Sequence, residues 1–358
     1  MSKDLFERNP YDINIYYDDL VKDANYYKIN IFEKSNHIII AHDTMINKKV
    51  TITKDSIGNV DELQKINSKL KIIDRYGYII GNYAEFDIYD LVNSSKFSDY
   101  VYDNIISFKI GDISISIKNA SNMFQFLKDI EYGYENDNEY VNTISMCGIN
   151  NVNYADYLNM AIYILWNIPE NESKDINISK FIDEKINGEE YTDVYFGEVF
   201  YFYNEAMKII DTEISILYFY KILEYFFLVI RKDEFKNIIK RYIRDENIDY
   251  AISELSKIYK QQELLQLKFL LEYIELDIQE IIDEAISKDI IRTCNISEFA
   301  EALYSFRNSI VHGKSSEKFD LKLPNRFINN EEEIFWKYTI KFISEVLTNK
   351  LCIKTKKL

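Results

Sequence analysis

Three residues near the C-terminal end of the chain have side chains that can act together on a phosphodiester. Arg307, Asn308 and His312 stand in the stretch FRNSIVHGK, and His312 is one of only three histidines in 358 residues. Histidine ordinarily titrates near neutral pH, so it can take a proton from an RNA 2′-hydroxyl. The forked guanidinium of arginine suits the charge that a phosphate gains during the attack that follows. The three residues therefore indicate RNA cleavage by its own 2′-OH, a reaction that requires no metal ion.

The spacing of these residues decides whether they can meet. On an α-helix Asn308 and His312 are four residues apart and share a face, whereas Arg307 and His312 differ by about 140° around the axis. The latter two can still converge, because arginine is long and the helix can unwind at Gly313. The same spacing also fits a surface arginine, a polar asparagine and a histidine that ends a helix. The pattern by itself leaves both interpretations open.

A helix over residues 296–312 is predicted to carry the three residues. Apolar side chains recur there at helical spacing and would face the core. They are Phe299, Leu303, Phe306 and Ile310. Ser297 is expected to cap the start of this helix and Gly313 to stop it, which places His312 on the last turn. Exposed carbonyl groups at that end favour a protonated imidazole.

The stretch FRNSIVHGK resembles the signature of the HEPN superfamily, in which an R-[NHD]-x-x-x-H motif lies near the end of a helix in a small α-helical bundle. The longer form LYSFRNSIVHG is similar to that of the Apea-like HEPN group. The aromatic run ISILYFYKILEYFF at 214–227 also resembles the second helix of that group. The resemblance covers roughly residues 195–350, and the motif matches at Arg307, Asn308 and His312.

This resemblance implies a metal-independent endoribonuclease without a cofactor, in which Arg307 holds the scissile phosphate, His312 handles protons and Asn308 positions either group. HEPN domains usually pair so that two motifs face one cleft, which implies a homodimer through the helical domain. Such enzymes commonly cut tRNA or other RNA, as toxins or in anti-phage defence and abortive infection. The alternative is a catalytically inactive HEPN domain that serves as a dimerisation or RNA-binding scaffold.

Three further residues are secondary candidates for the same site. Glu224 is a lone acid in an apolar and aromatic stretch, so it either pairs with the arginine or orients the histidine, or else faces solvent near Lys221. Tyr304 lies one turn before the asparagine and either reaches the cleft or packs in the core or in a dimer. Lys314 follows the motif directly and either contacts an RNA phosphate or is simply solvated.

The rest of the chain predicts an α+β protein of two domains. Residues 1–168 are predicted to form a β-rich domain that senses a trigger or binds an inhibitor. The acidic segment 169–194 is predicted to be a linker, and 195–358 an all-α bundle of HEPN type. Expected strands lie at 13–17, 27–32, 37–42 and 48–53, two strands interrupted near Gly77 are expected over 70–83, and a hairpin is expected at 104–120. Expected helices lie at 121–131, 155–168, 233–245, 296–312 and 330–351, with two helices meeting near 211–212 and one long or two stacked helices over 252–286.

Charge and composition limit the remaining classes of protein. The formal net charge of −16 argues against a surface that coats nucleic acid. Residues 191–358 carry 24 basic and 28 acidic side chains, against 19 and 31 in residues 1–190, so the helical half repels a polyanion less. No apolar run approaches the ~20 residues that span a bilayer, and the polar start MSKDLFERNPYD predicts no signal peptide. We therefore expect a cytoplasmic protein that does not enter a membrane.

Metal, disulfide and nucleotide sites are not expected. The three cysteines, Cys147, Cys294 and Cys352, are far apart and form no CxxC pair. His37 and His42 would point to opposite faces of one strand. Walker A, GxGxxG, HExxH and GxSxG motifs are absent from the sequence. The C-terminal KTKKL is predicted to be a frayed basic tail.

Overall fold

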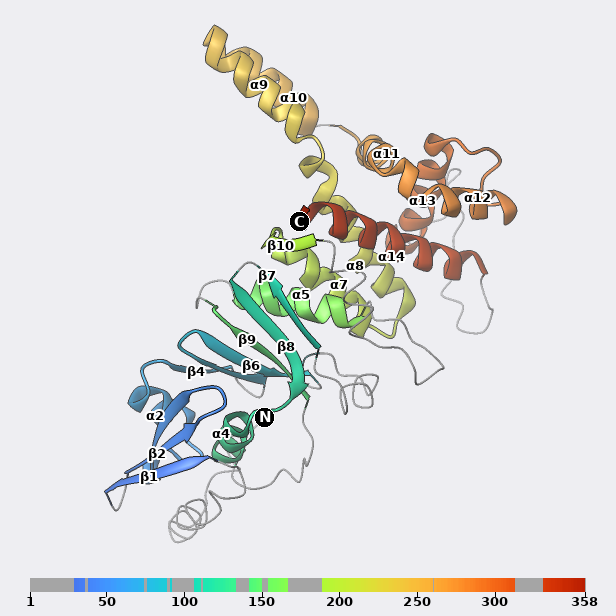
Figure 1. Cartoon of the computed structure of the whole chain (residues 1–358). Coiled ribbons are helices and arrows are strands. Elements are labelled where there is room, and N and C mark those ends of the chain that lie inside the picture. The colour runs from blue at the N-terminus through green and yellow to red at the C-terminus, as the bar shows by residue number, and fades with distance from the viewer. Residues whose placement is uncertain are drawn as a thin grey trace. The chain divides into compact units, whose positions relative to one another are not determined.

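The chain folds into two compact units. The computed structural model describes residues 29–35, 38–73, 76–88, 91, 106–110, 112–132, 142–149, 154–166, 189–259, 261–312 and 331–357. One unit comprises Met1–Asp193 with Thr355–Leu358, and the other comprises Val194–Lys354. The first contains two β-sheets and the second is helical (Figure 1), so the predicted α+β class is confirmed.

The first sheet has three antiparallel strands in the order β1–β2–β3. They span Asn30–Ser35, Ile38–Asp43 and Lys48–Thr53. Three of the predicted strands are therefore confirmed to within a few residues, and the one at 13–17 lies outside the described residues. Buried Asp43 accepts hydrogen bonds from the amides of Met45 (2.9 Å) and Met123 (3.1 Å). Its carboxylate thus ties the β2–β3 turn to the start of helix α4 (Asn122–Tyr132).

The second sheet has eight strands in the order β11–β10–β7–β8–β9–β6–β5–β4. In chain order they are β4 Leu70–Ile73, β5 Gly77–Ile80, β6 Tyr83–Asp87, β7 Ile106–Ile110, β8 Ile113–Asn119, β9 Asn142–Cys147, β10 Glu189–Val194 and β11 Ile353–Lys357. The predicted hairpin is confirmed, because β7 and β8 pair antiparallel with Ile110 opposite Ile113. Gly77 is required at the start of β5, because a Cβ there would lie 2.1 Å from the carbonyl oxygen of Glu85.

A buried carboxylate links three strands of this sheet to helix α4. Glu85 on β6 is fully buried. It accepts hydrogen bonds from the hydroxyls of Tyr78 (3.0 Å), Tyr83 (2.8 Å) and Thr143 (2.7 Å), and from the amide of Ser121 (2.7 Å). Burial and the nearby carboxylate raise the pKa of both tyrosines, so they remain neutral donors. The charge is stabilised because every one of these contacts is a donor.

Among the described residues of this unit, the other helical elements are the 3₁₀ turn η3 Lys54–Ser56, α2 Val60–Ile66 and α5 Tyr154–Trp166. Asn59 caps α2 through a hydrogen bond from the amide of Glu62 (3.2 Å). The predicted cap of α4 is confirmed, because the amide of Phe124 donates to the Ser121 hydroxyl (3.1 Å).

The described residues of the second unit form helices α7 to α14. Their bounds are α7 Gly197–Lys208, α8 Thr212–Val229, α9 Lys232–Asp245, α10 Ile248–Tyr259, α11 Glu263–Tyr273, α12 Gln279–Ser287, α13 Ile296–His312 and α14 Glu331–Leu351, with a 3₁₀ turn η6 at Glu275–Asp277. The predicted junction near 211–212 is confirmed, because Asp211 accepts from the amide of Ile214 (3.1 Å) and caps α8. Among the helices that the structure describes, none combines the length and the apolar character needed to cross a membrane.

Trp336 of α14 anchors α13 in the core of the helical unit. It is fully buried, and its ring lies 5.7 Å from the rings of both Phe299 and Phe306. Leu303 is also fully buried on α13. The predicted apolar stripe of this helix is therefore confirmed at three positions, while Ile310 is only partly buried.

Several local expectations from the sequence are wrong. Asn295, not Ser297, caps α13, because the Asn295 side chain accepts from the Ser297 amide (2.7 Å). The segment 252–286 breaks near Gln261 and again near Ile274, which separates α10, α11 and α12. The end of the expected linker forms β10, which pairs in parallel with β7, and the expected C-terminal tail forms β11.

Candidate active site

Arg307 lies on the side of helix α13 that faces α8 and α11. Its neighbour Asn308 is buried, with 5% of its surface exposed. The guanidinium of Arg307 donates from Nη1 to the Asn308 side-chain oxygen at 3.0 Å. Two residues adjacent in sequence are thus held together by their side chains, so the orientation of the guanidinium depends on the asparagine.

Two carboxylates from other helices also hold Arg307. Its Nη2 lies 2.8 Å from Oε1 of Glu224 on α8 and 3.5 Å from Oε1 of Glu263 on α11. The Tyr220 hydroxyl donates to the same oxygen of Glu263 at 3.0 Å, and the Tyr220 ring lies 5.0 Å from the Arg307 guanidinium carbon. The pairing of Glu224 with Arg307, one of the alternatives from the sequence, is therefore present. Lys221 instead lies over the rings of its neighbours, 4.6 Å from that of Tyr218.

The guanidinium is largely covered in this arrangement. Only 16% of the Arg307 side chain is exposed. Its Nε is buried and has no hydrogen-bond partner among the residues that the structure describes. Nη1 is bound to Asn308 and Nη2 to the two carboxylates, so both donors at the end of the fork already have partners. A phosphate that forms a bidentate pair with Arg307 would therefore have to replace Glu224 on Nη2.

The electrostatics of Glu224 show that its charge is not fully stabilised. Burial raises the pKa of Glu224, the charge of Arg307 lowers it, and the charge of Glu263 raises it again, with a net upward direction. Burial and Glu263 likewise raise the pKa of Tyr220, which stays a neutral donor. Two carboxylates share one guanidinium here, so the attraction between Arg307 and Glu224 is partly offset by repulsion between the acids.

Replacement of Glu224 by glutamine should therefore not destabilise the protein near neutral pH. A folded-state pKa above the ordinary value of 4.5 means that the folded chain binds the proton more tightly. The stabilisation from protonated Glu224 is present below pH 4.5 and is lost as the pH rises through the raised pKa. The Glu224→Gln chain should equal or exceed the wild type in free energy of unfolding at neutral pH, and the difference should vanish on acidification. Urea denaturation at both pH values checks this, and a variant that is clearly weaker at neutral pH would refute it.

The other sequence candidates are placed only in part. His312 is the last residue of α13, five residues after Arg307, and its side chain lies outside the described part of the structure. Lys314 lies outside the described residues altogether. Tyr304 is half-buried on α13 and does not belong to the group of contacts around Arg307. The structure thus brings together Arg307, Asn308 and Glu224.

Of the two histidines in the N-terminal half, the structure describes His42. His42 makes a long contact (3.4 Å) with the side chain of Asn47, and His37 is outside the described residues. Within the described ranges, no three His, Cys, Asp or Glu side chains are grouped so that they could hold a metal ion.

Two residues that contact Arg307 were not selected from the sequence. Tyr220 lies four residues before Glu224, so helical spacing on α8 could have placed both on one face. Glu263 is the first residue of α11 and approaches Arg307 only through packing of α11 on α13. No local pattern in the sequence indicates that approach.

Comparison of the chain with protein-family models, with curated proteins and with solved structures found no match.

Proposed function

We propose that the helical unit is a metal-independent endoribonuclease of HEPN type, centred on Arg307, Asn308 and His312. The observation that carries the proposal is the hydrogen bond from Arg307 to Asn308 on the helix that ends at His312. A buried amide that orients a guanidinium is what a phosphate-binding arginine needs from its surroundings. The C-terminal half has a net charge of −4, against −12 in residues 1–190, so it repels an anionic substrate less than the N-terminal half does.

In the proposed reaction the His312 imidazole removes the proton of an RNA 2′-OH. The oxygen attacks the adjacent phosphorus, and the bond from phosphorus to the 5′-oxygen breaks as that oxygen takes a proton from water. The protonated imidazole then returns its proton to the solvent. Arg307 stabilises the negative charge on the pentacoordinate phosphate, and Asn308 keeps the guanidinium in place. The products carry 2′,3′-cyclic phosphate and 5′-OH ends.

The wider setting of the proposal comes from the resemblance. The enzyme would act in the cytoplasm as a homodimer of helical units, with tRNA as one candidate substrate, and serve as a toxin or an anti-phage effector. The β-rich unit would bind the trigger or inhibitor that controls cleavage. Displacement of Glu224 from Arg307 is one way in which such control can act, because phosphate and carboxylate compete for the same donors.

A second candidate function is a catalytically inactive HEPN scaffold for dimerisation or RNA binding. The observation that favours it is the burial of Arg307 among Glu224, Glu263 and Asn308, since an internal ion-pair network also explains the arginine without a substrate. The two candidates differ in whether the chain cleaves RNA.

Purified full-length protein incubated with total RNA and excess EDTA separates them. The nuclease proposal predicts discrete RNA fragments with EDTA present, and toxicity on expression in a bacterial host that His312→Ala relieves. The scaffold would remain as the function if no RNA is cleaved and if expression is either not toxic or equally toxic with His312→Ala.

A further inference from the structure

Helices α9 and α10 form an antiparallel hairpin (Figure 1). A small apolar core lies between the two helices. It contains Ile238, Ala251 and Ile258, with Leu228, Phe235 and Leu255 packed against it. At the base, buried Arg231 pairs with Glu234 at 2.6 Å and lies 5.1 Å from the ring of Phe269 on α11. The hairpin is therefore joined to the rest of the helical unit at its base.

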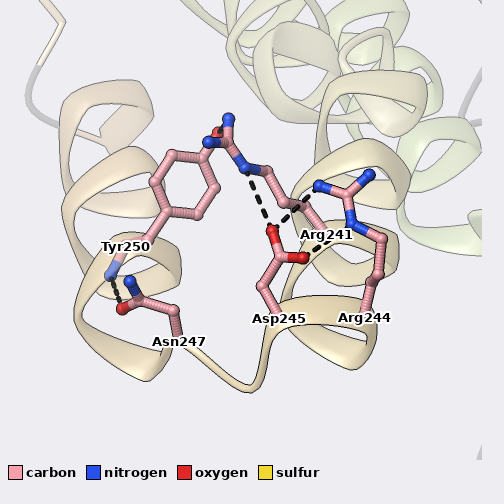
Figure 2. Close-up of polar contacts among 5 residues, drawn as sticks. All are labelled: Arg241, Arg244, Asp245, Asn247 and Tyr250. Carbon is pink, nitrogen blue, oxygen red and sulfur yellow. Dashed lines mark hydrogen bonds and ion pairs between the residues drawn. The ribbon is translucent and has the colours of Figure 1, made fainter.

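One face of the hairpin is closed by polar contacts near the turn. Figure 2 shows Arg241 of α9 reaching Tyr250 of α10, with a hydrogen bond of 2.9 Å to the hydroxyl and the guanidinium carbon 4.0 Å from the ring centre. Asp245 pairs with Arg241 (3.6 Å) and with Arg244 (2.6 Å). Asn247 accepts from the Tyr250 amide (3.0 Å) and caps α10. These contacts place Arg241 and Tyr250 on the same face.

The opposite face is apolar and open. Helical spacing puts Ile239 and Ile243 on the flank of α9 that turns away from Arg241, and Ile248 and Ile252 on the flank of α10 that turns away from Tyr250. In an antiparallel pair these two flanks lie on one side of the hairpin. Each of the four side chains is exposed by 52–69%. The four residues are named the isoleucine face below.

An aromatic contact continues the isoleucine face toward the base of the hairpin. The ring of Tyr259 on α10 lies 6.2 Å from that of Phe235 on α9, and Tyr259 is itself mostly exposed. Isolated apolar side chains on a surface need no explanation, but a continuous stripe across two helices indicates an interaction site.

The isoleucine face lies in the half of the hairpin nearest the turn. At a rise of 1.5 Å per residue, Ile248, Ile243, Ile252 and Ile239 lie roughly 2, 5, 8 and 11 Å from the middle of the turn. These heights alternate between the two helices. The isoleucines of a second, identical isoleucine face would therefore fit between those of the first, provided that both turns lie at the same end. Farther from the turn, the same flank of α9 carries Lys232 instead of an apolar residue.

The two outer edges of the isoleucine face differ in charge. The edge on α9 carries Lys236 and Lys240, and the edge on α10 carries Asp249 and Ser253. All four side chains are exposed. Lys236 pairs with Asp233 at the surface (3.3 Å), and such a pair contributes little and can be exchanged. One edge is thus basic, and the other is acidic and polar.

We propose that the isoleucine face binds the same face of a second copy of this chain, forming an antiparallel four-helix bundle. When the two-fold axis runs parallel to the helices, α9 of each copy lies against α10 of the other, and both turns lie at the same end. The two sets of isoleucines then interleave, and Lys240 of each copy lies beside the edge that holds Asp249 of the other.

The other two-fold arrangement of the same faces is disfavoured. With the axis across the helices, α9 would lie against α9, so the two lysine edges would meet and repel each other. The turns would also lie at opposite ends, which places the isoleucines of one copy against Lys232 of the other. Both the charges and the positions of the apolar side chains therefore select the first arrangement.

The strength of this dimer is limited by its size. Helices of 14 and 12 residues are about 20 Å long. Two such hairpins form an interface near the lower limit of size for specific complexes, where weak and transient complexes are found. We therefore design the measurement around a dissociation constant on the order of 10 μM. The inference is independent of the proposed nuclease activity, because it depends only on the hairpin.

Exchange of the edge charges tests the arrangement directly. Full-length Lys240→Glu and Asp249→Lys chains should each dimerise about tenfold more weakly than the wild type, because the symmetric dimer brings two edges of like charge together at both sides of the interface. In a mixture of the two variants both edges are again complementary, so a heterodimer should form. Sedimentation equilibrium measures the dissociation constants, at protein concentrations from ten times below to ten times above about 10 μM. A wild type that stays monomeric throughout, or a mixture that associates no better than each variant alone, would overturn the proposal.

A second experiment replaces two side chains of the isoleucine face. Ile243→Glu/Ile252→Glu should raise the dissociation constant at least tenfold while the far-ultraviolet circular dichroism is unchanged. Leu276→Glu is the matched control, because Leu276 is 95% exposed in η6 and lies outside the hairpin. A dimer that survives the double isoleucine substitution would place the interface elsewhere. RNA is absent from these measurements, so this proposal and the nuclease proposal can fail separately.

Discussion

Replacement of His312 by alanine should lower the single-turnover rate of RNA cleavage by about 10²–10⁴-fold, the usual contribution of a general acid or base. The expected loss follows from the role of the imidazole, which removes the 2′-OH proton in the proposed reaction. Gel analysis of a labelled RNA, with EDTA present, measures the rate. The far-ultraviolet circular dichroism of both proteins, recorded in parallel, checks that the helices are intact.

His42→Ala is the matched control for this substitution. His42 contacts Asn47 near the β2–β3 turn and takes no part in the proposed reaction, so its variant should retain the wild-type rate. If His312→Ala also retained a rate within a few fold of the wild type, His312 would have no role in proton transfer.

Replacement of Glu85 by alanine should destabilise the β-rich unit by about 3–5 kcal/mol, the range for removal of one partner from a buried charged network. The substitution leaves the hydroxyls of Tyr78, Tyr83 and Thr143 and the amide of Ser121 without this acceptor. These donors are buried or partly buried, so water replaces the carboxylate poorly. Chemical denaturation monitored by tyrosine fluorescence measures the change in free energy of unfolding.

Glu62→Ala is a control within the same unit. Glu62 pairs with exposed Lys65 on the surface (3.2 Å), so its loss should change the free energy of unfolding by about 0.5 kcal/mol or less. Similar effects of the two substitutions would mean that the Glu85 network contributes no more than a surface ion pair.

Local signals in the sequence predicted most elements of the fold. The apolar stripe of α13, the Asp211 cap of α8 and the Ser121 cap of α4 each depend on residues within a few positions of one another. The alternation of isoleucine and serine in β8 likewise follows from burial of one face of a sheet. Such features are encoded locally, so they could be predicted without knowledge of the fold.

Features that depend on distant partners could not be predicted. Strand β10 occurs in an acidic segment because it pairs with β7, and β11 in a basic segment because it pairs with β10. The breaks near Gln261 and Ile274 contain neither glycine nor proline, so the helical pattern of 252–286 shows no stop. Ser297 was a reasonable cap by type, but Asn295 two residues earlier begins the helix.

The same distinction applies to the candidate site. Arg307, Asn308 and Glu224 could be selected from the sequence because of their residue types and the motif that contains the first two. Glu263 could not, because only the packing of α11 on α13 brings it to the arginine. The enclosure of the guanidinium by two carboxylates is therefore the main new fact about the site.

Cleavage of an RNA that carries a single 2′-deoxy nucleotide at the scissile position, with EDTA present, shows whether the 2′-OH is the attacking group. The unmodified RNA should yield 2′,3′-cyclic phosphate and 5′-OH ends, and the deoxy substrate should not be cut at that position, because its attacking oxygen is missing. Cleavage of the deoxy substrate at the wild-type rate, or products that carry 5′-phosphate ends, would contradict the proposed chemistry of Arg307 and His312.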